Sequence, residues 1–279
     1  MTTTSMDHVR DLDLPPAPVA PGLSHGRLLD GVADSSAMVG RSLRHVVRNI
    51  DSLVMAVVLP VMILVLFVYV FGGAMSTEGD YIDYVVPGII LLCASFGSAS
   101  TAVSVSSDMA NGIIDRFRSL PIASGAVLTG HVVASLVRNF VATAVVVGVG
   151  VLMGFRPTAG PAEWVAALGL LTLFIVAISW VSVCLGLLAG SAEAANGLTF
   201  AFLFLPYVSS AFVPTDTMPG WLHGFAQHQP VTPVIEAVRG LLMGAPVGSS
   251  GWLSIAWFGG IIVVAYVAAR VLFTRRTVH

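Results

Sequence analysis

Residues 164–190 read WVAALGLLTLFIVAISWVSVCLGLLAG, a stretch of 27 residues without a single charged side chain. A helix needs about 17–25 residues to cross a hydrocarbon core of roughly 30 Å. The stretch is continuously apolar and lacks the period-two alternation of a membrane-barrel strand. It therefore predicts a helix that spans a membrane, since helices satisfy all their own backbone groups there.

Charge is scarce throughout the chain of 279 residues, of which 10% are charged and 56% are hydrophobic, with a mean hydropathy of +0.89. A soluble domain carries about 25% charged residues. Six long stretches hold no charged residue: Asp51 to Glu78, Asp83 to Asp108, Arg138 to Arg156, Glu163 to Glu193, Glu193 to Asp216, and Arg239 to Arg270. We predict an all-α membrane protein with six transmembrane helices, at about 52–72, 84–107, 125–154, 164–190, 195–213 and 252–273.

The first 51 residues divide into a polar tail and a basic segment. Residues 1–35 contain four prolines and no apolar core of a secretory signal, so we predict a disordered cytoplasmic tail. In residues 36–51, Val39, Leu43 and Val47 follow helical spacing with arginines between them. This pattern favours an amphipathic helix lying on the membrane surface over a plain juxtamembrane stop of positive charge. Residues 36–275 are then one transmembrane domain.

Arginine placement predicts the orientation of the chain. With the N-terminus inside, the inner segments hold ten arginines and the outer segments hold two, Arg156 and Arg239, while Arg138 falls within the third span. Cytoplasmic segments of membrane proteins carry the excess of basic residues. We therefore expect a multi-pass protein of the plasma (inner) membrane with both termini in the cytoplasm.

All thirteen basic residues are arginine, and the chain contains no lysine. A P-loop nucleotide site and a Schiff-base enzyme each require a lysine. Any ATP dependence must therefore come from another polypeptide, and no nucleic-acid partner is expected.

No metal or cofactor is expected on this chain. Cys93 and Cys184 lie in apolar runs, where a thiol is usually a small buried hydrophobe. His223 and His228 lack a convincing third ligand.

Residues 108–124 link the second and third predicted spans and include GIIDRFRSLPIA at 112–123. Asn111 can cap a short helix that Pro121 ends. One face of this 111–120 helix is apolar and the other is charged; its residues include Ile113, Ile114, Asp115, Arg116, Phe117, Arg118 and Leu120. An aromatic side chain between arginines is common in protein interfaces. The pattern fits a docking element, and it fits equally an apolar face resting on the membrane.

Residues 214–250 form the longest link and include PTDTMPGWL at 214–222 and QPVTPVIEAVR at 229–239. Each motif can start a short helix with a proline in its first turn. An apolar stripe on the second helix favours a re-entrant pair at 218–244 over a surface loop. Glu236 and Arg239 can pair at i, i+3, and with Trp221 they are candidates for an external gate.

These three motifs, in this order among six spans, resemble type-2 ABC exporter permeases, and residues 36–275 share their span order. The subgroup that the chain is most similar to is that of the daunorubicin-type drug or lipid exporters of actinobacteria. The resemblance implies a homodimeric permease that exports a drug, antibiotic or lipid. It also implies two copies of a separate ABC ATPase, which binds ATP and Mg, and a 111–120 helix that couples this ATPase to the spans.

Two features are candidates for the substrate pathway. Arg138 costs about 2.5–3.5 kcal/mol at the centre of a membrane helix, so it must snorkel, pair or contact a substrate. Phe200, Phe204 and Tyr207 share one face of the fifth span, which faces lipid, a neighbouring helix or the central cavity that the resemblance implies there.

Two other functions compete with an ATP-driven permease. A secondary carrier usually has an acidic residue within a span, and none lies clearly mid-span here. An intramembrane enzyme needs a nucleophile and a base at matching depth. The serines of the second span have no such partner and fit close helix packing instead.

Overall fold

The computed structural model describes residues 50–74, 80–111 and 124–276, and every regular element in these ranges is helical. The 1–35 tail, nearly all of the 36–51 surface helix and all of the 111–120 segment except Asn111 lie outside the described residues. The all-helical fold class is confirmed. Four helices are long and apolar enough to cross a membrane, and the segment Ala56–Phe71 is shorter and apolar.

The long helices lie close to the charge-free stretches of the sequence. They are α3 (Tyr81–Ala110), α5 (Ser124–Met153), α6 (Pro161–Leu188) and α10 (Ser250–Arg276). The shorter first element is α2 (Ile50–Val65), which continues as a π-helix, η1 (Leu66–Phe71). Pro161 starts α6 because its fixed φ suits the first turn and its missing N–H has no helical partner there.

The predicted fifth span is an interrupted helix. Its helical part, α7 (Ala192–Leu203), has twelve residues, and a short 3-10 helix, η2 (Pro206–Val208), follows it. Pro206 explains the break, since proline lacks an N–H and collides with the carbonyl four residues earlier. The Oγ of Ser191 caps the start of α7 by accepting the Ala194 N–H at 3.2 Å.

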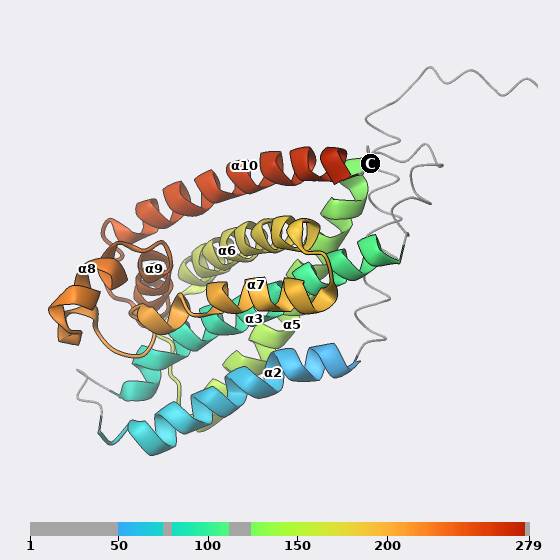
Figure 1. Ribbon diagram of the computed structural model, residues 1–279. Helices are drawn as coiled ribbons and strands as arrows, with labels where there is room; N and C mark the ends of the chain where they lie inside the picture. The colour runs from blue at the N-terminus through green and yellow to red at the C-terminus, as the bar shows by residue number, and fades with distance from the viewer. Residues whose placement is uncertain (1–49, 75–79, 112–123, 277–279) are drawn as a thin grey trace, which may run out of the picture.

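Helix α3 is the central element of the bundle. It packs against α2, α5, α6, α7 and α9, and Figure 1 shows α2 and α10 on opposite sides with α3, α6 and α7 between them. Its fully buried side chains include Val85, Ile89, Leu91 and Leu92. The main hydrophobic core therefore lies along α3, between α5 and α6.

Two short helices close one end of the bundle. They are α8 (Gly220–His228) and α9 (Val231–Met243), and they lie at the end opposite the C-terminus of α10 (Figure 1). The Leu242 carbonyl accepts the backbone N–H groups of Thr158 and Ala159 at 3.0 and 3.2 Å. These bonds attach α9 to the link between α5 and α6.

Candidate functional site

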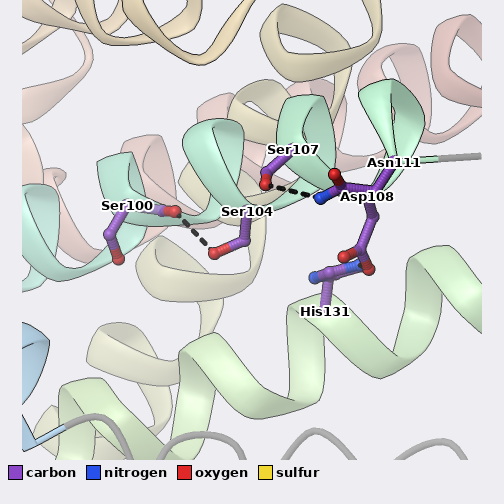
Figure 2. Close-up of polar contacts among 6 residues, drawn as sticks. All are labelled: Ser100, Ser104, Ser107, Asp108, Asn111 and His131. Atoms are coloured by element: carbon purple, nitrogen blue, oxygen red, sulfur yellow. Dashed lines mark hydrogen bonds and ion pairs between the residues drawn. The ribbon is translucent and has the colours of Figure 1, made fainter. Parts of the chain in front are cut away.

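The end of the bundle next to residues 112–123 is held by a polar contact between α3 and α5. His131 Nε2 lies 3.2 Å from Asp108 Oδ2, and both side chains are mostly buried. Figure 2 shows the two side chains pointing toward one another across the helices. Asn111, predicted to cap the next segment, ends α3 by donating its backbone N–H to the Ser107 carbonyl at 3.0 Å. The coupling candidates Ile113 to Leu120 lie outside the described residues.

Arg138 lies in the middle of α5 and is only 8% exposed. It does not snorkel toward the helix end. Its Nη2 donates to the Gly97 carbonyl at 3.1 Å and to the Thr101 Oγ1 at 3.2 Å, both on α3. The Nε is buried without a hydrogen-bond partner.

Beside Arg138, a hydrogen-bonded polar cluster joins α3, α5 and α6. Asn139 Nδ2 donates to Ser98 Oγ at 3.2 Å and to the Ser135 carbonyl at 2.9 Å. Ser179 of α6 donates to Ser135 Oγ at 2.8 Å. All of these residues are buried. Such side-chain hydrogen bonds hold helices together where water is absent.

Close packing at Gly97 makes this contact possible. A Cβ atom on Gly97 would overlap the Asn139 Oδ1. Asn139 therefore lies directly against the α3 backbone, at a position where any larger residue on α3 would displace it.

Exposed aromatic side chains run from α7 into the segment that follows it and belong to a longer row. Phe200, Phe204 and Tyr207 are 61%, 55% and 37% exposed. Successive ring centroids lie 5.5 and 6.2 Å apart, and Tyr207 stacks on Phe212 at 5.5 Å. Phe212 in turn stacks on Phe67 of η1 at 4.2 Å. We call these five rings the aromatic row; the sequence did not indicate that Phe67 belongs to it.

The external gate candidates differ in exposure and in contacts. Trp221 on α8 is 81% exposed, whereas Arg239 on α9 is half-buried. The Arg239 Nε donates to the Tyr84 carbonyl at 3.0 Å and its Nη2 to the Ser210 carbonyl at 2.6 Å. Its guanidinium carbon lies 3.8 Å from the centroid of the Tyr84 ring.

The predicted pairing of Glu236 with Arg239 is wrong. Glu236 accepts a hydrogen bond from Ser250 Oγ at 3.2 Å, and Arg239 points to the two backbone carbonyls. The i, i+3 spacing permits an exposed ion pair of small energy. Two hydrogen bonds from the guanidinium to backbone carbonyls in a partly buried site contribute more energy than this ion pair. The reason is that a hydrogen bond from a charged donor is stronger than one between neutral groups.

Tyrosines of α3 hold the irregular segment 209–213 together with Arg239. Tyr81 donates its hydroxyl to the Phe212 carbonyl, and Tyr84 donates to the Ser210 carbonyl, both at 3.0 Å. A Cβ on Gly88 would lie 2.5 Å from the Ala211 carbonyl oxygen, so the two backbones touch. No local pattern in the sequence predicts this arrangement, which we call the cap clamp: Tyr81, Tyr84, Ser210, Phe212 and Arg239.

No group of three His, Cys, Asp or Glu side chains within residues 50–74, 80–111 and 124–276 could hold a metal ion. Cys93 and Cys184 are free thiols that contact the carbonyls of Ala56 and Ala265. His223 and His228 contact the carbonyls of Thr215 and Gly224.

Comparison with known proteins identifies the family. The model of the ABC-2 type transporter family matches residues 35–243. The chain belongs to the ABC-2 type transporter family. It is the permease subunit of an ABC exporter, and the ATPase is a separate subunit with which the family's permeases act.

Three curated relatives are permeases. The daunorubicin resistance ABC transporter permease protein DrrB1 of Streptomyces coeruleorubidus is 31% identical over 226 residues, 80% of each chain. The probable doxorubicin resistance ABC transporter permease protein DrrC of Mycobacterium tuberculosis is 28% identical over 281 residues, the full length of both chains. The putative transport permease ycf38 of Cyanophora paradoxa is 26% identical over 77% of this chain and 74% of its own. The resemblance to daunorubicin-type exporter permeases is thereby confirmed.

Proposed function

We propose that this permease, as a homodimer driven by two copies of a separate ATPase, forms the pathway for a hydrophobic or amphipathic drug, antibiotic or lipid. The names of the relatives, which mention daunorubicin and doxorubicin resistance, support the drug class. The absence of lysine from the chain agrees with ATP hydrolysis elsewhere.

The observation that carries the proposal is the interrupted helix α7 together with the exposed end of the aromatic row, Phe200, Phe204 and Tyr207. Backbone that is not helical is tolerated at membrane depth only where protein covers it or where it lines a water-filled cavity. Residues 204–213 follow α7 as turns and a 3-10 helix. Exposed Phe204 and Tyr207 belong to this interrupted part. Side chains of the same chain already bond the carbonyls of this segment, so it is the exposed rings that support a pathway or a subunit interface here.

Six membrane crossings per subunit are supported by the way in which α7 and the residues after it run along α3. Near one end of α3, Ala102 packs with Ala195 of α7; near the other, Tyr81 bonds to Phe212. The 21 residues from Tyr81 to Ala102 correspond to about 32 Å of helix, close to the roughly 30 Å of a hydrocarbon core. This match supports the interrupted segment as a sixth crossing beside α2, α3, α5, α6 and α10.

The arginine bias supports cytoplasmic termini and an external position for α8 and α9. In this orientation the cap clamp lies at the outer end of the pathway. Trp221, exposed on α8, and Arg239, bound to α3 and residue 210, are then parts of the external gate. Glu236 contributes through its bond to Ser250 at the start of α10.

The 111–120 segment follows α3 directly and would dock to the ATPase on the cytoplasmic side. The contact between Asp108 and His131 supports this role, because it ties together the two helices that flank the segment. Motion imposed on the segment would then reach α3 and α5 together.

The test of the pathway is Phe204→Ala, measured in cells that make the permease with its ATPase and are loaded with the neutral dye Nile red. Loss of one aromatic contact, about 1–3 kcal/mol, should lower ATP-dependent efflux by roughly fivefold or more. The control is Trp257→Ala on α10, where the ring is similarly exposed at 46%. Equal efflux by both variants and the wild type would contradict a pathway at the aromatic row.

The docking claim has its own test. Phe117→Ala should reduce co-purification of the ATPase, or leave ATP hydrolysis running without efflux. Unchanged assembly together with unchanged coupling would remove the docking claim and leave the pathway claim standing.

A further inference from the structure

The strongest unexplained feature of the described residues is the guanidinium of Arg138. It lies 14 residues from Ser124 and 15 from Met153, about 21–23 Å from either end of α5. Its side chain is 92% buried, being 8% exposed. A buried charge of this kind needs a compensating partner.

The protein partners of Arg138 are all neutral. Nη2 bonds to the Gly97 carbonyl and the Thr101 hydroxyl, while Nε has no partner. Two of the five N–H donors of a guanidinium satisfy neutral acceptors here, and no described acidic side chain forms an ion pair with the guanidinium.

Among the side chains that the structure describes, no carboxylate forms an ion pair with this guanidinium. Helices α5 and α10 contain no acidic residue, and those of α2, α3, α6 and α7 lie only in a first or last turn. The nearest along α3, Asp108, lies seven residues from Thr101, about 10 Å away, and contacts His131.

Two other polar atoms of α5 also lack partners. Asn139 Oδ1 and Thr143 Oγ1 are buried and unbonded. Asn139, whose amide nitrogen already bonds to Ser98 and Ser135, fixes the position of α5 against α3.

We infer that Arg138 binds the oxyanion head group of an amphiphile, a carboxylate, sulfate or phosphate, at the level of Gly97 and Thr101, near the edge of the hydrocarbon core that adjoins Ala102. This inference rests on the proposed transport of an amphipathic substrate and narrows its class. A planar guanidinium matches an oxyanion by paired hydrogen bonds. A cationic amphiphile meets like charge at the same place, so the site selects by charge.

The test is direct binding without ATP to the full-length permease in nanodiscs of phosphatidylcholine. The probes are pyrenedodecanoic acid and its primary amide, which share the tail and differ in charge. We expect the acid to bind the wild type at least about tenfold more tightly than the amide, a factor that corresponds to about 1.4 kcal/mol. Equal affinity for the two probes would overturn the inference with no variant needed.

Two substitutions separate charge from hydrogen bonding. Arg138→Lys keeps the charge and should retain most of the preference for the acid. Arg138→Gln can still donate to the Gly97 carbonyl but should bind acid and amide alike. A preference that persists in Arg138→Gln would overturn the inference. Affinity for the amide should remain unchanged in both variants, which checks that they are folded.

A second experiment distinguishes whether the bound head group belongs to a membrane lipid or to a transported molecule. Nanodiscs with one quarter phosphatidylglycerol should weaken acid binding to the wild type if a membrane lipid occupies the site. ATP-driven movement of the acid in proteoliposomes with the ATPase identifies the transported molecule instead. Binding with no transport would retain the oxyanion site while contradicting the proposed function, so the two failures are distinguishable.

Discussion

Arg239 holds three segments of the cap together, and its replacement by methionine tests that arrangement. The side chain donates to the carbonyls of Tyr84 on α3 and Ser210 after α7, and it lies over the Tyr84 ring. Met keeps the apolar length of the side chain but removes both donors and the charge. The two carbonyls then lose a partner in a half-buried site.

The contacts set the expected size of the effect. Hydrogen bonds to a charged group contribute about 1.5–3 kcal/mol each, and a cation–π contact about 0.5–2 kcal/mol. Relaxation offsets part of this sum, because Ser210 still accepts a bond from the Tyr84 hydroxyl at 3.0 Å. We expect Arg239→Met to lose roughly 3–5 kcal/mol of stability, and Arg239→Lys to lose about half as much because lysine keeps the charge.

The assay is thermal unfolding of the full-length permease in detergent micelles, with Arg270→Met as the control. Arg270 also lies over a tyrosine, but it is exposed, and its guanidinium carbon lies 5.9 Å from the Tyr266 ring centroid. An exposed cation–π contact contributes about 0.5–1 kcal/mol. At about 2–4 °C per kcal/mol, the midpoint should fall by about 6 °C or more for Arg239→Met and by at most about 4 °C for the control. Equal shifts in the two variants would refute the proposed strength of the cap clamp.

Two further predictions concern α3 and its neighbours. Gly97→Ala should cost about 1–3 kcal/mol in unfolding experiments, because its Cβ would overlap Asn139. The control Gly169→Ala, with open space around it, should gain up to about 1 kcal/mol; a neutral Gly97→Ala would contradict the close packing. Asp108→Asn should weaken the contact with His131 and speed amide exchange in the last turn of α3, measured by mass spectrometry, while unchanged exchange there would argue against a tie between α3 and α5.

The sequence predicts the long helices well because their cause is local. A charge-free run as long as a hydrocarbon core favours a helix in a membrane, and α3, α6 and α10 follow such runs. Helix α5 extends past its charge-free run and includes Arg138, and the run between Glu193 and Asp216 is interrupted. Six crossings remain a proposal, because α7 alone is too short. The break in the helix at Pro206 can be predicted from a local rule. The side chains that donate hydrogen bonds to the carbonyls after the break cannot be predicted in this way, because they come from distant parts of the chain.

The candidate site is less predictable because its contacts join residues far apart in the chain. Tyr81 and Phe212 are separated by 131 residues, and Arg239 and Tyr84 by 155. The local rule that pairs Glu236 with Arg239 failed for this reason. The serines of α3 were interpreted as small packing residues, and they do permit close contact. Ser98 also bonds to Asn139 of α5, a partner that no periodicity reveals.

The arrangement of these contacts gives α3 a specific place in the proposed transport cycle. At one end Tyr84 is bound to Arg239 and to the segment after α7; at the other Asp108 is bound to His131, next to the proposed docking segment. Between them lies the contact of Arg138 with Thr101. A buried helix with close backbone contacts moves as a unit rather than bending continuously. Displacement of the docking segment by an ATPase would therefore reach the oxyanion site and the outer cap through the same helix.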